Sequence, residues 1–260
     1  MSKNIVVTGG SSGIGAAVVA RLRASGCHIW NIDVAKADSQ GVTHVHCDLA
    51  DPVAVEDAIE QLPAHIHGFI SVAGLAPGVG SEEQLLAVNF LSVRLLIERL
   101  QTRVVDAGSM VIVASSAGRD WRENLPAVEG LLGTQGFAAG LDWLQTNLTV
   151  WQDNAYKFSK QCAAAYTYRA VGLGRDRGVR VNCINPGIVE TPLSPAFRTM
   201  LGGETFDYIV NASGRAGQPD EIAAVAEYLL IGDCAWLNGV ELTVDGGYYA
   251  GLVGGWINPP

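Results

Sequence analysis

Short apolar runs alternate with segments of helical periodicity along most of the chain. The apolar runs predict strands over 4–8, 27–33, 44–49, 68–73, 109–115, 180–185 and 240–244. The periodic segments predict helices over 13–25, 52–62, 82–102, 155–174 and 219–230. Strands that are apolar at nearly every position are buried on both faces, as in a parallel sheet between two layers of helices. We therefore expect an α/β fold with a doubly wound parallel sheet of about seven strands.

Two long segments interrupt this alternation, one at about 119–152 and the other at about 188–217. Loops of this length inside a compact domain are usually functional. Both leave from the carboxyl ends of predicted strands, where open parallel sheets bind their ligands. We expect residues 1–260 to form a single domain, with the inserted segment at 119–152 and the loop at 188–217 bordering a substrate cleft.

Composition and charge exclude several classes of function. The net charge of −9 argues against nucleic acid as a partner and against anionic membrane surfaces. No apolar stretch is long enough to span a bilayer, and the first residues lack the apolar core of a signal peptide. The five cysteines are widely spaced and lie mostly in apolar runs, which is typical of buried thiols in a reducing compartment. We predict a cytoplasmic protein.

Two pairs of histidines raise the question of a metal. His44 and His46 alternate on one predicted strand, and His65 and His67 repeat the spacing. A zinc site needs further ligands in tetrahedral geometry, and the sequence offers no matching third ligand. We expect no metal.

The segment TGGSSGIG at 8–15 follows the first strand and opens the first helix. Glycine lets a ligand approach the main chain, and a helix N-terminus offers N–H groups to phosphate. The candidate cofactor residues here are Gly9, Ser11, Ser12, Gly13, Ile14 and Gly15. Asp33 ends the second strand, where a carboxylate accepts hydrogen bonds from ribose hydroxyls and repels a 2′-phosphate. With no Arg or Lys at position 34, this favours NAD over NADP, although the same residues also suit an ordinary turn.

Further candidate cofactor residues follow the other strands of the predicted sheet. A carboxylate after the third strand can reach the adenine amino group, and small residues after the fourth let a ribose lie on the main chain. Each position is a weak signal alone, but together they surround one crevice at the strand ends. These residues are Asp48, Leu49, Ala73, Gly74, Pro186, Gly187, Ile188 and Thr191.

A candidate catalytic group lies in YKFSK at 156–160. Tyr156 and Lys160 are four residues apart and share one helix face. A nearby ammonium favours the phenolate, so Tyr156 could take the proton of an alcohol as hydride leaves for NAD⁺. A serine at Ser115 or Ser116, where the fifth strand ends, could donate to the substrate oxygen. Asn89 is a polar residue in an otherwise apolar helical segment and could bind main-chain groups or hold a water.

In these motifs the chain resembles the short-chain dehydrogenase/reductase family, whose members have a Rossmann-type sheet in the strand order 3-2-1-4-5-6-7. The resemblance implies that Ser116, Tyr156 and Lys160 form the catalytic triad, with Asn89 as the fourth member. Ser116 is preferred over Ser115 because the family's serine directly precedes a small pair. The resemblance also implies that Tyr156 and Lys160 contact the cofactor, Lys160 at the nicotinamide ribose. The matching motifs are TGGSSGIG (8–15), CDL (47–49), AG (73–74), VN (88–89), VASSAG (113–118), YKFSK (156–160), NPG (185–187) and VDGG (244–247).

Two features depart from the usual family pattern. Ser71 and Val72 stand where the family usually has two asparagines. The serine and tyrosine are separated by the long inserted segment, which resembles a sub-group that includes bacterial 3α-hydroxysteroid and coniferyl-alcohol dehydrogenases. Family members are mostly dimers or tetramers, which implies a homodimer or homotetramer, although the insertion could block one of the usual contact surfaces.

The sequence thus predicts an NAD-dependent alcohol dehydrogenase or carbonyl reductase. Aromatic and apolar residues in the two long segments suit an apolar alcohol or ketone with a ring, such as an aromatic, terpenoid or steroid compound. Half or more of them could instead pack the core of the insertion. An anionic substrate, with a carboxylate or phosphate group, stays an alternative because of Arg119, Arg122 and Arg198. The alternatives are a catalytically silent NAD-binding protein and an epimerase or dehydratase that recycles tightly held NAD. The candidate substrate residues are Ser116, Tyr156, Trp151, Phe197 and Met200.

Overall fold

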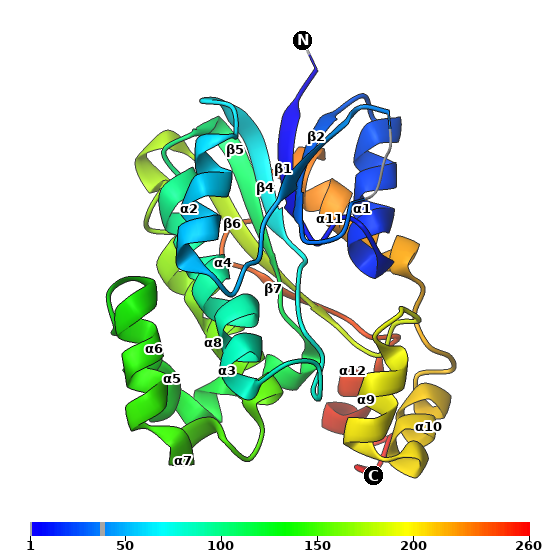
Figure 1. Ribbon diagram of the computed structural model, residues 1–260. Coiled ribbons are helices and arrows are strands. Elements are labelled where there is room, and N and C mark those ends of the chain that lie inside the picture. The colour runs from blue at the N-terminus through cyan, green and yellow to red at the C-terminus, as the bar shows by residue number, and fades with distance from the viewer. Residues whose placement is uncertain (1, 37–39) are drawn as a thin grey trace.

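A parallel sheet organises the chain, and its strands run in the predicted order β3-β2-β1-β4-β5-β6-β7 (Figure 1). The computed structural model describes residues 2–36 and 40–260. The strands are β1 (Asn4–Thr8), β2 (His28–Asp33), β3 (Val42–His46), β4 (Ile66–Ser71), β5 (Val104–Val113), β6 (Arg180–Pro186) and β7 (Glu241–Val244). The predictions of fold class and strand order are confirmed.

Helices cover both faces of this sheet. The α-helices are α1 (Gly13–Ala24), α2 (Pro52–Glu60), α3 (Glu82–Leu86), α4 (Ser92–Leu100), α5 (Leu125–Leu132), α6 (Gly136–Thr146), α7 (Leu148–Trp151), α8 (Ala155–Ala170), α9 (Ser194–Leu201), α10 (Gly203–Ala212), α11 (Pro219–Ile231) and α12 (Tyr248–Gly254). Short turns η1 (Ala87–Leu91), η2 (Ser116–Gly118), η3 (Trp121–Asn124) and η4 (Arg175–Arg177) complete the elements.

The continuous apolar strands supply two separate cores. Successive side chains of a strand point to opposite faces. Ile5 and Val7 of β1 therefore pack with Val18 of α1 and Leu229 of α11, whereas Val6 joins the cluster beneath α2, α4 and α8. This explains why almost every position of the strand is apolar, as the sequence pattern indicated.

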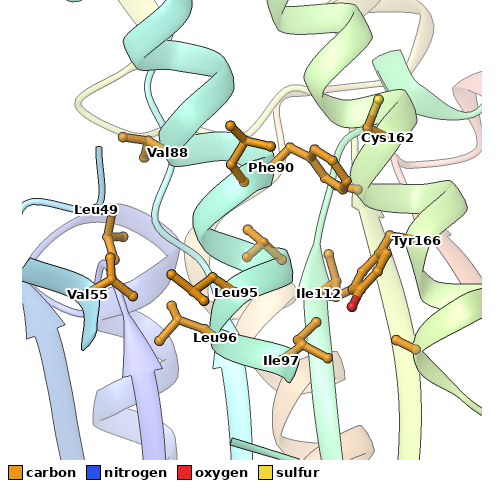
Figure 2. Packing of buried hydrophobic residues seen from close by; sticks show 14 of the residues in the cluster. Leu49, Val55, Val88, Phe90, Leu95, Leu96, Ile97, Ile112, Cys162 and Tyr166 are labelled. Carbon is orange, nitrogen blue, oxygen red and sulfur yellow. The ribbon is translucent and has the colours of Figure 1, made fainter. Parts of the chain in front are cut away.

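The second cluster holds α4 and α8 against the sheet (Figure 2). Phe90 and Tyr166 meet edge to face with ring centroids 6.0 Å apart, and Leu96 and Ile112 beside them are fully buried. Burying one such side chain contributes about 1.5–3 kcal/mol relative to leaving it exposed. The packing fixes α8, whose first turns carry the candidate catalytic tyrosine and lysine.

The predicted helix over 82–102 is divided by a π-helical turn. The segment runs as α3, then η1, then α4, and Asn89 stands in the middle of η1. A π turn inserts a residue into the helical ladder and occurs frequently at functional sites. The polar residue that looked out of place in the sequence therefore marks a real change of geometry.

The inserted segment forms its own layer of three short helices beside α4 and α8. In Figure 1, α5, α6 and α7 lie on the side of the molecule away from α9, α10 and α12. Trp143 stacks on Phe158 of α8 with ring centroids 6.1 Å apart. The buried Arg94 of α4 donates to main-chain carbonyls of Leu131, Thr134 and Gly136 between α5 and α6. Apart from its first residue, the insertion does not border the cleft, so that expectation is wrong.

Candidate active site

The carboxyl ends of the strands open into a cavity of about 770 Å³. Its walls come from the glycine-rich turn after β1, the ends of β2 to β6, and helices α8, α9, α10 and α12. Most of the predicted cofactor residues line it, including the carboxylates and the residues that end β4 and β6. Those in the wall are Gly9, Ser12, Gly13, Ile14, Gly15, Asp33, Asp48, Leu49, Ala73, Gly74, Tyr156, Lys160, Pro186, Gly187, Ile188 and Thr191.

The glycine-rich turn has room for glycine alone at two positions. At Gly9, with a φ of +73°, an added Cβ would lie 2.6 Å from Cα of Ala73. At Gly15 an added Cβ would lie 1.9 Å from the carbonyl oxygen of Gly9. Ser12, the N-cap of α1, makes no side-chain capping bond, so the first N–H groups of this helix stay available. An exposed helix N-terminus in a cavity wall fits the pyrophosphate of a dinucleotide.

Asn31 supports the glycine-rich turn, and the sequence analysis did not identify it as a site residue. Its side-chain oxygen accepts from Gly10 N at 2.9 Å, and its amide donates to Ser11 Oγ at 3.0 Å. Ser11 donates its N–H to Asp33 at 3.0 Å and its hydroxyl to the carbonyl of Ala35. Ser11 is not among the residues that line the cavity and serves to orient Asp33. The available signal was a second polar residue, two positions before Asp33, in the buried part of β2.

The two carboxylates at this end of the cavity have no cationic neighbour in its wall. Asp33 is the last residue of β2, and Asp48 follows β3. The Asp48 carboxylate accepts a hydrogen bond from Ala50 N at 2.9 Å. Among the described residues that line the cavity, Arg119 and Lys160 are the only arginine or lysine side chains. Both belong to the far end of the cavity. The end formed by β2 and β3 is therefore acidic, which suits ribose hydroxyls and not a phosphate.

The turn after β4 is held without the two asparagines that the family usually has there. Thr8 Oγ1 accepts hydrogen bonds from the main chain of Val72 at 3.1 Å and of Ala73 at 3.2 Å. Gly74 follows, and an added Cβ at this position would lie 3.6 Å from Lys160 Nζ. The departure at Ser71 and Val72 is thus compatible with a closed turn beside the lysine.

Tyr156 and Lys160 lie on the first turns of α8, with both side chains in the cavity wall. Lys160 Nζ lies 5.8 Å from the centroid of the Tyr156 ring and donates to the carbonyl of Val113 at 3.2 Å. Burial raises the pKa of Tyr156 to about 12 and lowers the pKa of Lys160 to about 8. Desolvation of the charged forms, not attraction between the two side chains, dominates both shifts.

The structure places Ser115, not Ser116, against the tyrosine. A hydrogen bond with Ser115 is the one influence that lowers the pKa of Tyr156 against its burial. Ser115 is the last extended residue before η2, and its Oγ accepts from Ala117 N at 3.1 Å. Ser116 also lines the cavity but begins the next turn. Because one residue changes the direction of a side chain here, the contact with Tyr156 belongs to Ser115, and the catalytic role of Ser116 stays a prediction.

Asn89 lies behind the cavity wall. Its side chain accepts from Leu75 N at 2.7 Å and donates to the Leu75 carbonyl at 3.1 Å. It also donates to Ser159 Oγ at 3.3 Å, and Ser159 donates to the carbonyl of Tyr156 at 2.7 Å. Asn89 therefore connects the loop after β4 with the first turn of α8. This arrangement makes it a positioning residue in the present geometry.

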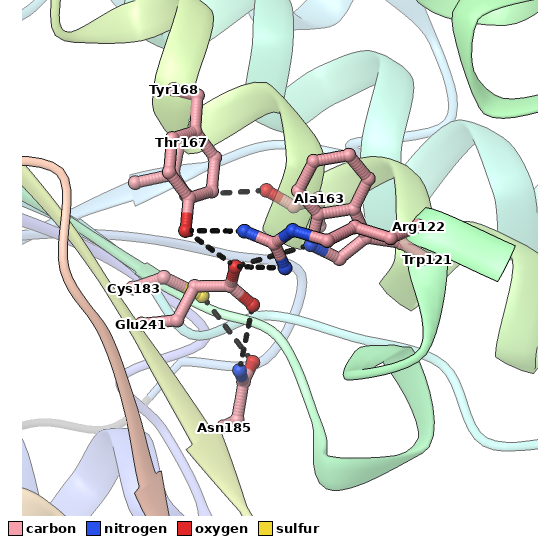
Figure 3. A network of polar contacts seen from close by, with 8 residues as sticks. All are labelled: Trp121, Arg122, Ala163, Thr167, Tyr168, Cys183, Asn185 and Glu241. Atoms are coloured by element: carbon pink, nitrogen blue, oxygen red, sulfur yellow. Dashed lines mark hydrogen bonds and ion pairs between the residues drawn. The ribbon is translucent and has the colours of Figure 1, made fainter. Parts of the chain in front are cut away.

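A polar network around Glu241 holds the chain that follows the serines (Figure 3). The Glu241 carboxylate of β7 accepts from Trp121 Nε1 at 3.1 Å, from the Tyr168 hydroxyl at 2.8 Å and from Asn185 Nδ2 at 3.3 Å. Arg122 pairs with the same carboxylate. The start of the insertion is thereby tied to α8, β6 and β7, which restrains the turn carrying Ser115.

The end of the cavity near Tyr156 is largely apolar. Phe197 of α9 meets the Tyr156 ring edge to face with centroids 5.1 Å apart, and Met200 lines the same wall. Trp151 is only 4% exposed, donates from Nε1 to the Leu144 carbonyl, and packs inside the insertion. Phe197 and Met200 are therefore in the predicted place, whereas Trp151 is not. The remaining apolar lining at this end comes from Leu201, Phe206, Ile209 and Leu252.

Comparisons with known proteins identify the relatives of this chain. Residues 3–127 match the family model for short chain dehydrogenase, and residues 125–249 match that for enoyl-(acyl carrier protein) reductase. The chain is 34% identical to coniferyl-alcohol dehydrogenase of Pseudomonas sp. (strain HR199 / DSM 7063) over 95% of this chain and 96% of that protein. It is 25% identical to 3-alpha-hydroxysteroid dehydrogenase/carbonyl reductase of Comamonas testosteroni, with 94% and 95% covered.

A solved structure has the same fold as this chain. The 3-alpha-hydroxysteroid dehydrogenase of Pseudomonas sp. B-0831, crystallised with NADH, matches with a TM-score of 0.80 and 29% identity, over 96% of this chain and 98% of that one. The protein is therefore an oxidoreductase with a Rossmann-type fold. The chain belongs to the short-chain dehydrogenase/reductase family. Within the described ranges, no helix combines the length and the apolar character needed to cross a bilayer.

Proposed function

We propose that this protein interconverts a hydroxyl and a carbonyl group on an apolar, ring-bearing compound, with NAD as the hydride carrier. The observation that carries the proposal is the meeting of Tyr156, Lys160 and Ser115 in one wall of the cavity that also contains the glycine-rich turn. A dinucleotide at the turn and an alcohol at the tyrosine would share one enclosed space.

The choice of NAD rests on the acidic end of the cavity. Asp33 is oriented by the N–H groups of Ser11 and Ala35, each at 3.0 Å, and faces the cavity. A carboxylate held in this way is suited to accept from ribose hydroxyls and to repel a 2′-phosphate. The glycine-rich turn would hold the pyrophosphate, and Lys160 and Thr191 would hold the nicotinamide end.

The chemical roles follow from the contacts of the side chains. The dinucleotide, when bound, supplies the hydride acceptor and a positive charge. Tyr156 takes the proton of the substrate hydroxyl, or returns it to the alkoxide in the reverse direction. Ser115 donates to the substrate oxygen and keeps it beside the tyrosine. The Lys160 ammonium, 5.8 Å from the tyrosine ring, favours the phenolate over the buried neutral phenol.

The substrate class is supported by the walls around Tyr156. Phe197, Met200 and Phe206 give this end an apolar surface shaped by aromatic rings. Such a surface suits aromatic, terpenoid or steroid alcohols and the corresponding ketones or aldehydes. Coniferyl-alcohol and hydroxysteroid dehydrogenases among the relatives fall within the same range.

The proposal is tested by the formation of NADH, followed by its absorbance, with phenylpropanoid, terpenoid and steroid alcohols. Each alcohol is offered with NAD⁺ and with NADP⁺. We expect turnover of at least one alcohol, faster with NAD⁺, and loss of turnover in Tyr156→Phe, which removes the proton-transferring hydroxyl and keeps the ring. NAD binding without turnover of any alcohol would favour the silent dinucleotide-binding alternative.

A further inference from the structure

Two polar side chains interrupt the apolar end of the cavity. Arg119 follows η2, and Tyr248 begins α12; both line the cavity at the end that holds Tyr156. They come from segments far apart in the sequence, one after β5 and the other after β7. Neither has a part in holding the dinucleotide in the arrangement described above.

Protein groups hold one side of the Arg119 guanidinium, and the N–H groups on its other side are not used. Its Nη1 donates to the carbonyl of Ser116 at 2.9 Å, and its guanidinium lies 4.6 Å from the centroid of the Tyr249 ring. In the described part of the chain, its other N–H groups have no hydrogen-bond acceptor. A guanidinium presents its donors in a rigid planar fork, so the unused ones keep a defined direction.

Tyr248 places a hydroxyl in the same region. The residue is only 7% exposed, and its hydroxyl makes no hydrogen bond to any residue that the structure describes. Arg119 lies against the ring of the next residue, Tyr249, so Arg119 and Tyr248 belong to one part of the cavity wall. Burial raises the pKa of Tyr248, and the positive charge of Arg119 acts in the opposite direction. The Tyr248 hydroxyl is not fully buried and the residue lines the cavity, so the hydroxyl is open to a ligand there.

The other two arginines considered in the sequence are already occupied. Arg122 pairs with Glu241, and Arg198 of α9 forms an ion pair with Asp207 of α10. Neither lines the cavity. Arg119 is thus the one of the three that can reach a ligand there.

We propose that Arg119 and Tyr248 form a specificity subsite for a hydrogen-bond-accepting oxygen on the ring of the substrate, strongest for a negatively charged oxygen. This inference rests on the proposed function, because it assumes a ring-bearing alcohol in the cavity. Arg119 bonds to Ser116, the neighbour of Ser115, so the subsite and the reacting oxygen share one wall. A substrate would place its alcohol at Tyr156 and a phenol, methoxy or carboxylate oxygen at the subsite.

The test compares three alcohols with the same frame: cinnamyl alcohol, which has no ring oxygen, coniferyl alcohol, and the para-carboxy derivative of cinnamyl alcohol. The quantity measured is the ratio of kcat/KM for an oxygenated alcohol to kcat/KM for cinnamyl alcohol. In Arg119→Leu and in Tyr248→Phe we expect this ratio to fall about tenfold for at least one oxygenated alcohol, as the loss of a charge-assisted hydrogen bond predicts.

Two further variants separate recognition from general disturbance. Arg119→Lys keeps the charge and should retain part of the preference for the carboxylate. Tyr249→Phe keeps the ring under Arg119 and should keep the ratio of the wild-type protein, because the Tyr249 hydroxyl does not line the cavity. Equal ratios in wild type, Arg119→Leu and Tyr248→Phe would overturn the inference.

Failure of the proposed function would look different. If no alcohol is oxidised with NAD⁺, the same ratio is taken from dissociation constants, measured by titration of the protein's tryptophan fluorescence. Weaker binding of the oxygenated alcohols to both variants would then support the subsite without the proposed activity. Equal affinities in wild type and variants would overturn the subsite as well.

Discussion

Tyr156 and Lys160 are both buried, and burial disfavours the charged form of each. It raises the pKa of the tyrosine to about 12 and lowers that of the lysine to about 8. The sequence correctly indicated that the pair shares one helix face. It could not indicate the depth of burial, which depends on the loops after β4 and β5 and on α9. The electrostatic balance at the site was therefore beyond sequence reasoning.

The buried lysine predicts a pH-dependent stability. In the unfolded chain the amine keeps its ordinary pKa of 10.5, whereas in the folded protein the pKa is about 8. The folded state binds fewer protons between these values, so stability falls as the pH decreases from about 10.5 to about 8. The shift corresponds to about 3 kcal/mol. We expect Lys160→Met to be more stable than wild type at about pH 7, by at most this amount.

Urea unfolding of both proteins at about pH 7 and about pH 10 measures the effect. The stability difference should shrink toward the higher pH, where the folded lysine is already neutral and the unfolded lysine begins to lose its proton. A difference that stays constant with pH would show that the lysine is not titrating as its burial requires.

The two adjacent serines predict a sharp contrast between variants. Ser115 contacts Tyr156, so Ser115→Ala should lower kcat/KM about 100-fold, the usual cost of losing one donor to a reacting oxygen. Ser116→Ala should change it less than about threefold. Steady-state kinetics on one alcohol compares them directly. A larger loss in Ser116→Ala would restore the assignment made from the sequence motif.

At the scale of elements, the sequence predicted the regular parts of the fold better than the interruptions. The alternation of buried strands and periodic helices predicted the sheet, and the strand ends predicted most of the residues that line the cavity. Periodicity did not reveal the π turn at η1, although Asn89 marked it. The insertion was wrongly expected to border the cleft, because apolar aromatic residues such as Trp151 suit a cleft wall and a helical core equally well.

The π turn predicts a specific cost for losing Asn89. Asn89→Leu leaves the partly buried N–H and carbonyl groups of Leu75 without these partners, which should destabilise the protein by about 1 kcal/mol. Denaturant unfolding measures the difference from wild type. Equal stability of Asn89→Leu and wild type would mean that the asparagine does not hold the loop after β4.

At the scale of the whole molecule, the insertion and the sheet edge bear on assembly. Helices α5 and α6 cover α4 and α8, one of the surfaces expected to join subunits. The edge strand β7 has a neighbour on one side only. Trp236, in the loop before β7, is 99% exposed, and Tyr228 of α11 is 48% exposed. We propose that a second copy of the chain covers this edge to form a homodimer.

Light scattering after size-exclusion chromatography tests this assembly. The wild-type protein should have twice the chain mass of 27.4 kDa. Trp236→Glu places a charge in the proposed contact and should shift the protein toward the mass of one chain, with its fold unchanged by circular dichroism. A wild-type monomer, or a dimer that persists in Trp236→Glu, would contradict the proposed edge contact.

If hydride passes from an alcohol held at Tyr156 to NAD⁺ in the same cavity, a label on the alcohol must appear in the reduced dinucleotide. The experiment supplies an oxidisable alcohol from the panel with deuterium on its carbinol carbon, and then determines the mass of the reduced dinucleotide. We expect the reduced dinucleotide to carry one deuterium and Tyr156→Phe to form almost none of it. Reduced dinucleotide without deuterium, or undiminished formation in Tyr156→Phe, would show that this transfer does not take place at Tyr156.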